Sequence, residues 1–399
     1  MNNDLVDRIK NFNADRNQTV LPIKYNIMAQ NPFCFLRGTC HLFYQDLLKN
    51  YPFDFSPVSW ICGDLHIENF GSYKGENRLL YFDMNDFDES LLAPLLFEIA
   101  RLVVSVEVKC TQIKYTTLQK KEIIKQLLQQ YRNELINNKS QVIEQETAKG
   151  LIKKLIDKVA ERKTNTLLIT RTNNKLKNVK LLISDKLLPI DADKKKQLIT
   201  EFTPWFEANH NKGFKVIDAG FRIAGTGSIG VQRYLCLLQN EKNPKQKKLI
   251  DIKRAAPSCI SNYANLMQPV WQNEADRIVK TQRMMQHVSP AFLSAFNFDN
   301  EVYVVKQLQP TSDKIIIQKD ARQNGYMQNY VEDLAMVTAS AQLRSSGRLQ
   351  SATADNLKEF ALSENWIEPL TEWCLHYAEV VQQNYNEYYK AFKAGYFKI

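Results

Sequence analysis

The glycine-rich run Gly225-Thr-Gly-Ser-Ile-Gly230, together with its flanking segments, constrains the fold more than any other part of the sequence. A G-x-G-x-x-G run also opens dinucleotide-binding folds, but in those folds a helix follows it. Here residues 231–238 alternate in polarity and contain β-branched and aromatic side chains, so they predict a strand. Strands are also expected at 214–223 and 249–253. The pattern therefore favours antiparallel strands joined by a glycine turn.

Most of the remaining chain has helical spacing, which makes the expected fold class α+β. Helices are expected at 33–48, 95–108, 193–209 and 270–287, as a pair within 117–163, and from 327 to the end. Further strands are expected at 58–62, 78–83 and 302–308.

The composition is that of a globular protein with an anionic partner. The 399 residues are 44% apolar and 11% aromatic, which excludes a disordered or fibrous chain. The 53 Lys and Arg outnumber the 43 Asp and Glu, giving a net charge of +10. This excess suits a nucleotide, a nucleic acid or a membrane surface. We expect no nucleic acid, because aromatic residues do not alternate with the basic ones in any stripe.

Neither a disulfide framework nor a membrane span is expected. The seven cysteines are scattered and include no C-x-x-C pair. The most apolar stretch, 91–108, contains Pro94, Glu98 and Arg101. The first residues are polar and lack a signal peptide, so we expect a cytoplasmic protein. Secretion by a dedicated system is the alternative left open.

A first polar constellation, Cys62-Gly-Asp-Leu-His-Ile-Glu-Asn69, follows a predicted strand. A tight loop can hold Asp64 beside an incoming hydroxyl group and Asn69 beside a metal ion, as phosphoryl transfer requires. His66 is either a general base or a residue that orients the loop. The alternative is a polar loop whose side chains only make turn hydrogen bonds.

A second constellation is the acidic run Asp83-Met-Asn-Asp-Phe-Asp-Glu89. Asp86 and Asp88 are two residues apart, so they share a face in an extended chain. Carboxylates grouped in this way suit Mg²⁺, which binds one or two of them together with substrate phosphates. A solvated acidic turn is the alternative.

The third constellation combines the glycine turn with Lys253 on the next predicted strand. Backbone N–H groups of such a turn cover nucleotide phosphates, and the lysine adds a positive charge. The residues expected to bind the nucleotide are Gly225, Thr226, Gly227, Ser228, Gly230 and Lys253. The alternative is a tight hairpin beside a surface lysine.

These motifs carry a resemblance. Gly63-Asp-Leu-His-Ile-Glu-Asn69, followed by a strand and Asp86-Phe-Asp88, resembles the aminoglycoside and choline phosphotransferase branch of the protein-kinase-like fold. The whole chain is similar to the bacterial family designated domain of unknown function 2252. The matching stretches are 31–38, 62–71, 82–90, 225–230, 252–255, 277–286 and the Tyr-rich tail from Tyr377.

The resemblance implies a role for each matching residue. Asp64 would be the catalytic-loop carboxylate and Asn69 a metal ligand. Asp86 would be the second metal ligand, with Asp83 and Asp88 as alternatives or helpers. Lys253 would contact the α- and β-phosphates of ATP.

The helix and strand after Lys253 would complete the nucleotide site. Glu274 would pair with Lys253, with Asp276 as the alternative. Residues 305–308, which include Gln307, would form the hinge beside the adenine. The sequence departs from the family twice: Glu98 stands where Asp is usual, and Gln342 stands where His is usual, which puts any catalytic role of position 342 in doubt.

The order of the motifs implies a circularly permuted, two-lobed kinase-like fold, because the catalytic loop precedes the glycine turn. We expect a helical lobe from 1–165 completed by 311–399, and a nucleotide-binding α+β lobe at 166–310. The expected activity is ATP- and Mg²⁺-dependent phosphate transfer to a hydroxyl group of a small molecule or protein. The alternatives are AMP transfer from the same pocket and an inactive kinase-like binding module.

Overall fold

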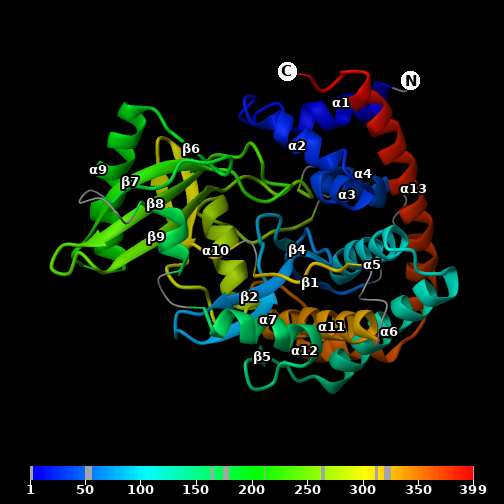
Figure 1. Cartoon of the computed structure of the whole chain (residues 1–399). Helices are drawn as coiled ribbons and strands as arrows, with labels where there is room; N and C mark the ends of the chain where they lie inside the picture. Colours follow the sequence, from blue (N-terminus) through cyan, green and yellow to red (C-terminus); the bar gives the residue numbers. More distant parts are fainter. Residues whose placement is uncertain are drawn as a thin grey trace.

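The computed structural model is a mixed α+β fold in which a large antiparallel sheet stands beside a helical body (Figure 1). The structure describes residues 3–49, 56–162, 166–173, 179–210, 212–261, 266–310, 313–318 and 325–398. No helix in these ranges is both long and apolar enough to cross a membrane.

The large sheet has six antiparallel strands in the order β10-β11-β9-β8-β7-β6. Their bounds are β6 (Leu187–Leu188), β7 (Phe214–Arg222), β8 (Arg233–Asn240), β9 (Lys247–Arg254), β10 (Ser294–Phe298) and β11 (Glu301–Gln307). The glycine turn joins β7 to β8, as predicted. The predicted strand at 249–253 is the main part of β9.

Strict alternation along β9 separates the two faces of this sheet. Ile250 and Ile252 belong to an apolar core that includes residues of helix α9 (Ala192–Asn209). The neighbouring side chains point to the opposite face because successive residues of a strand alternate. Asp251 and Lys253 are therefore held on the face turned away from α9.

The helical body is built from both ends of the chain around one core. Its helices are α1 (Asn3–Phe12), α2 (Leu21–Met28), α3 (Pro32–Gly38), α4 (Cys40–Lys49), α5 (Leu95–Gln112), α6 (Thr117–Asn137), α7 (Gly150–Ala160), α11 (Tyr326–Ser345), α12 (Ala354–Leu362) and α13 (Ile367–Lys393). Figure 1 shows the first and last helices, α1 and α13, side by side. The buried apolar helix α5 lies at the centre, as its sequence predicts.

Two smaller sheets carry the polar loops of the sequence. One pairs β1 (Val58–Ile61) with β4 (Leu91–Pro94), and the other has the order β2-β3-β5, with β2 (Phe70–Lys74), β3 (Leu80–Met84) and β5 (Ile143–Glu144). The first polar constellation connects β1 to β2, and the acidic run connects β3 to β4. The pairing of β1 with β4 and of β2 with β3 therefore brings these two loops together.

Some local expectations are corrected. The predicted helix 33–48 is two helices, α3 and α4, which are separated at Thr39. The predicted helix 270–287 is shorter, since α10 spans Glu274–Met285 and is capped by the Asn273 side chain. Strands β2, β4 and β10 were not expected. A short helix, α8 (Thr166–Arg171), precedes the sheet. The proposed lobe boundaries at residues 165 and 311 lie outside the described residues.

Candidate active site

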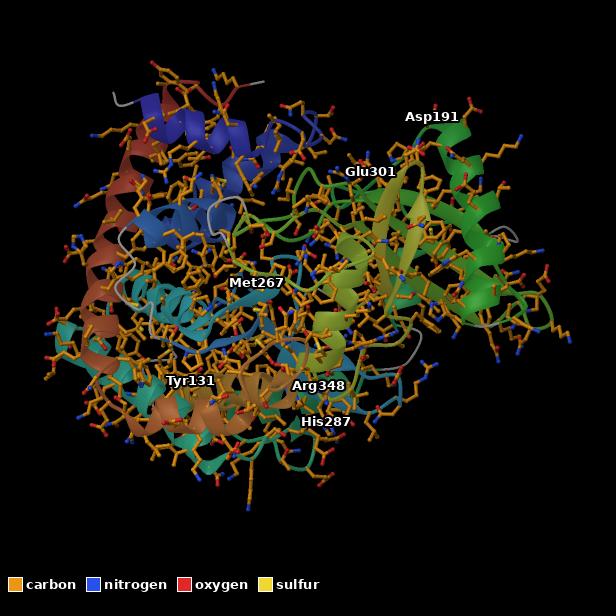
Figure 2. The ribbon with its side chains drawn as sticks, turned by 180° about the vertical axis from the view of Figure 1, so that it is seen from behind. Tyr131, Asp191, Met267, His287, Glu301 and Arg348 are labelled. Atoms are coloured by element: carbon orange, nitrogen blue, oxygen red, sulfur yellow. The ribbon has the colours of Figure 1, made fainter. Side chains whose placement is uncertain are left out.

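A cavity of about 1060 Å³ is lined by residues of both the large sheet and the helical body. Nine of the predicted site residues line it: Asp64, His66, Asp86, Asp88, Gly225, Thr226, Gly227, Ser228 and Gly230. The cavity also extends along the N-terminal segment between α1 and α2. Figure 2, viewed from behind, shows Glu301, another lining residue, at the end of the sheet nearest the N-terminal helices.

Arg101 of α5 holds Asp64 in place. Its Nε and Nη2 atoms donate hydrogen bonds to the same carboxylate oxygen, Oδ1, at 3.1 and 2.8 Å. Arg101 is fully buried, and Nη2 also donates to the carbonyl of Leu36 at 2.8 Å. Burial raises the pKa of Asp64, although Arg101 partly opposes the shift. Oδ2 accepts neither of these hydrogen bonds from Arg101, and it belongs to a carboxylate that accepts a proton more readily than usual.

Asn69 ties the first loop to the acidic run. Its Nδ2 donates to the carbonyl of Asp64 at 3.0 Å, and its Oδ1 accepts from the backbone N–H of Asp86 at 3.0 Å. Asn69 is buried and does not line the cavity. These two hydrogen bonds fix Asp64 and Asp86 relative to each other, and the metal-ligand role of Asn69 stays a prediction.

Lys253 reaches from β9 to both the glycine turn and the acidic run. Its Nζ donates to Ser228 Oγ at 2.7 Å, forms an ion pair with Asp88, and lies 4.0 Å from Asp86 Oδ1. The residues of the three constellations, separate in the sequence, thus converge at one place. The side chain of Lys253 is only 9% exposed, and Lys253 is not among the residues that line the cavity.

The charges of this cluster shift each other's pKa values. Burial lowers the pKa of Lys253 to about 8, while Asp86 acts in the opposite direction. Burial alone would raise the pKa of Asp86, but the positive charge of Lys253 and of further cations outweighs it, so this pKa is lowered. Asp86 is therefore ionised at neutral pH, and its side chain is 51% exposed within the cavity.

His66 lies on the cavity wall in a neutral form. Its Nδ1 accepts a hydrogen bond from the backbone N–H of Glu68 at 3.1 Å, and its Nε2 lies 3.2 Å from Nε of Arg37. Burial, reinforced by the charge of Arg37, keeps the pKa of His66 well below its usual value. Both ring nitrogens are occupied by the protein, which fits the orienting role better than that of a general base.

Three predicted residues lie away from the cavity. Asp83 is buried and paired with Arg344 at 3.1 Å. Glu274 does not reach Lys253, because Arg277, one turn further along α10, binds it at 2.6 Å. Its alternative, Asp276, pairs with Lys280 on the same helix.

The expected adenine-side hinge is the end of strand β11, where Gln307 is opposite Ile250 in the strand pairing. Gln307 is not among the residues that line the cavity.

The two departures from the family pattern are in contact with each other. Gln342 Nε2 donates to Glu98 Oε2 at 3.2 Å, while Glu98 Oε1 accepts from the backbone N–H of Cys62 at 2.6 Å. The hydroxyl of Tyr131, labelled in Figure 2, donates to Gln342 Oε1. Burial raises the pKa of Glu98 to about 7. Position 342 thus supports the start of the first loop through Glu98, and it does not line the cavity.

The sequence analysis missed the cations contributed by the N-terminal segment and by helix α5. Arg16 donates hydrogen bonds to the carbonyl of Ile229 at 3.0 Å and to that of Gly227, and so binds two residues of the glycine turn. The backbone N–H of Asn17 also donates to Gly230 O at 2.9 Å. These residues give no local signal, because their partners are about two hundred positions away. Arg101 could have been found as a charge inside an apolar helix, which demands a buried partner.

The carboxylates fit magnesium only in combination with phosphate. No group of three or more His, Cys, Asp or Glu side chains is arranged to hold a metal ion among the residues with described placement. Asp86 and Asp88 line the cavity as a pair of oxygen donors. Since Mg²⁺ binds proteins through one or two carboxylates plus substrate phosphates, this pair suits an ion that arrives with a nucleotide.

Comparison with known proteins gives a family but no function. The family described as "Uncharacterized protein conserved in bacteria (DUF2252)" matches residues 16–391. Neither the curated proteins nor the solved structures contain a match to the chain. The matched region begins at Arg16 and includes the glycine turn, both polar loops and Lys253. The chain therefore belongs to the DUF2252 family of bacterial proteins.

Proposed function

We propose that this protein transfers the γ-phosphoryl group of ATP, with Mg²⁺, to a hydroxyl group of an acceptor. The observation that carries the proposal is the convergence of Asp64, Lys253 and the Asp86–Asp88 pair around the glycine turn. Phosphoryl transfer depends on positioning and on neutralising phosphate charge, and these groups can supply both.

The order of elements in the sheet supports a kinase-like fold. Two strands flank the glycine turn, the lysine is on the next strand, and a helix and two more strands follow. This is the order in the nucleotide lobe of protein kinases. Here the catalytic loop comes earlier in the chain, so the proposal includes a circular permutation, with residues 166–310 as the nucleotide-binding lobe.

In the proposed reaction, Asp86 and Asp88 would hold Mg²⁺, which would supply positive charge against the phosphates of ATP. Lys253 contacts the phosphates after releasing Asp88. The acceptor oxygen attacks the γ-phosphorus, a new O–P bond forms, and the bond from that phosphorus to the β-phosphate oxygen breaks. ADP leaves, and the acceptor's hydroxyl proton passes to Oδ2 of Asp64.

Transfer of label from ATP to pools of small molecules and proteins tests this proposal. We expect γ-label to be transferred by the natural protein and by Asp185→Asn, an exposed control. Asp64→Asn should abolish transfer while leaving nucleotide binding nearly unchanged. Transfer of α-label would identify AMP transfer instead. Nucleotide binding without transfer of either label would favour the inactive binding module, and unchanged turnover in Asp64→Asn would refute the role of Asp64.

A further inference from the structure

Four arginines line the described part of the cavity, and three of them have a carboxylate partner. The three pairs are Arg8 with Asp46 at 2.8 Å, Arg37 with Glu68 at 2.9 Å and Arg254 with Glu301 at 2.8 Å. The fourth, Arg16, has no carboxylate within ion-pair distance among the described residues. The carboxylates of Glu89 and Asp15 act on Arg16 electrostatically, but neither forms an ion pair with it.

Arg16 uses only part of its hydrogen-bonding capacity on the protein. One nitrogen, Nη1, donates to the carbonyls of Gly227 and Ile229. Within the described residues, Nε and Nη2 donate no hydrogen bond to the protein. A guanidinium group has five N–H donors in a planar fork, a geometry that suits phosphate and carboxylate oxygens.

A second basic residue, Lys24, contacts the same backbone carbonyl as Arg16. Lys24 is completely buried, and its Nζ donates to Asn13 Oδ1 at 2.7 Å and to Gly227 O at 3.3 Å. Both cations face the ring of Phe12, at 5.1 Å for Arg16 and 5.6 Å for Lys24. Burial, with the charge of Arg16 as a further cause, lowers the pKa of Lys24 well below its usual value. Burial and the charge of Arg16 thus disfavour protonation of Lys24, and an anion bound beside the two residues would offset that effect.

The glycine turn separates this position from the proposed phosphate site. Lys253 contacts the turn at Ser228 Oγ, whereas Arg16 and Lys24 contact it at the Gly227 carbonyl. A Cβ atom added to Gly227 would lie 3.9 Å from Oδ2 of Asp64. Asp64 Oδ2, the oxygen proposed to accept the hydroxyl proton, is thus close to Gly227. Gly227 is also the residue that Arg16 and Lys24 contact, and Ser228, next to it, contacts Lys253.

We infer that Arg16, supported by Lys24, binds an anionic group of the acceptor, so that the acceptor is a hydroxyl compound bearing a phosphate or a carboxylate. The inference rests on the proposed function, because it assigns the nucleotide to the Lys253 side of the turn. The anion supplies an ion-pair partner, which Arg16 does not have among the described residues, and the acceptor's hydroxyl group then lies toward Asp64. Arginine is suited to this task because its fork binds two oxygens at once.

Inorganic phosphate is a direct probe of this site. Its binding to the full chain is measured by calorimetry with the nucleotide site saturated by Mg²⁺ and a non-hydrolysable ATP analogue. Arg16→Gln should weaken phosphate binding at least about tenfold, and Arg348→Gln, at an exposed arginine, should leave it unchanged. Asp15→Asn removes a nearby negative charge from an exposed side chain and should tighten binding about two- to threefold.

The outcomes separate the inference from the proposed function. Equal phosphate binding by Arg16→Gln and the natural protein would overturn the inference, and so would a failure of Asp15→Asn to tighten binding. Competition between phosphate and the ATP analogue would show that Arg16 serves a phosphate of the nucleotide itself, which also overturns it. If the analogue does not bind but phosphate binding still depends on Arg16, the anion site stands and the assignment of ATP fails.

Discussion

Arg101 directs both of its hydrogen bonds to Asp64 at one oxygen, Oδ1, and Asp64 lines the cavity. The two residues are thus asymmetric partners: one carboxylate oxygen is fixed by the protein, and the other is available for a proton. A partly buried carboxylate that is fixed at one oxygen has little freedom to reorganise during a reaction, which is the condition for efficient electrostatic catalysis.

Replacement of Arg101 by Gln should affect both stability and the ionisation of Asp64. Removing one partner of a buried pair leaves an uncompensated charge, so the free energy of unfolding should fall by about 3 kcal/mol. The pKa of Asp64 should rise further, and the acidic limb of any pH–rate profile should move to higher pH. Urea unfolding and the pH–rate profile check these effects, with Arg348→Gln as the control; an unmoved acidic limb would contradict this account.

Nucleotide affinity should decrease as the pH rises through the pKa of Lys253, which is about 8. The protonated amine attracts phosphate and the neutral amine does not, so affinity is greatest below this pKa. Binding of an ATP analogue should weaken several-fold between about pH 7 and about pH 9.5. Lys253→Arg retains its charge over this range, so its affinity should be nearly constant. A parallel decrease in both proteins would assign the effect to another group.

Glu98 should make stability pH-dependent in the acidic range. Its pKa is raised to about 7 in the folded protein from 4.5 in the unfolded chain, so the folded state binds the extra proton. The stabilisation is complete below about pH 4.5 and is lost as the pH rises through 7. Relative to Glu98→Gln, the natural protein should lose about 3 kcal/mol across this window. Urea unfolding at several pH values measures the difference, and parallel curves would disprove it.

Gly63 should not tolerate a side chain. Its φ is +87°, and an added Cβ would lie 2.2 Å from the carbonyl oxygen of Glu89. Gly63→Ala should therefore cost about 3 kcal/mol, the sum of backbone strain and overpacking. Gly347 is the matched control, because its φ is +66° but no atom lies within 4 Å of the added carbon. Gly347→Ala should cost only about 1 kcal/mol. Equal losses in urea unfolding would mean that the contact with Glu89 relaxes.

The sequence predicted the parts of this molecule that are set by local pattern. Alternation identified strands β7, β8 and β9, and the apolar run identified α5, because burial imposes these periods on the residues themselves. The grouping of Asp64, Asp86 and Lys253 was also predicted, since each stands beside a strand end or a turn with its own signature.

The sequence does not show which partner each polar side chain takes. Glu274 faces Arg277 on its own helix, and periodicity does not tell which neighbour a carboxylate will choose. Asn69 Oδ1 accepts a hydrogen bond from the backbone N–H of Asp86, a contact that the sequence does not predict. Arg16 and Lys24 are ordinary charges in sequence, and only the folded chain places the glycine turn against them.

The hydrogen bond between Arg16 and Gly227 spans 211 positions of the chain. A ribosome adding roughly 5–20 residues per second therefore exposes Arg16 about 10–40 s before its partner exists. During that interval the N-terminal segment lacks the glycine turn that it contacts in the complete fold. Any early chaperone contact at the N-terminal segment would have to be released once the glycine turn emerges.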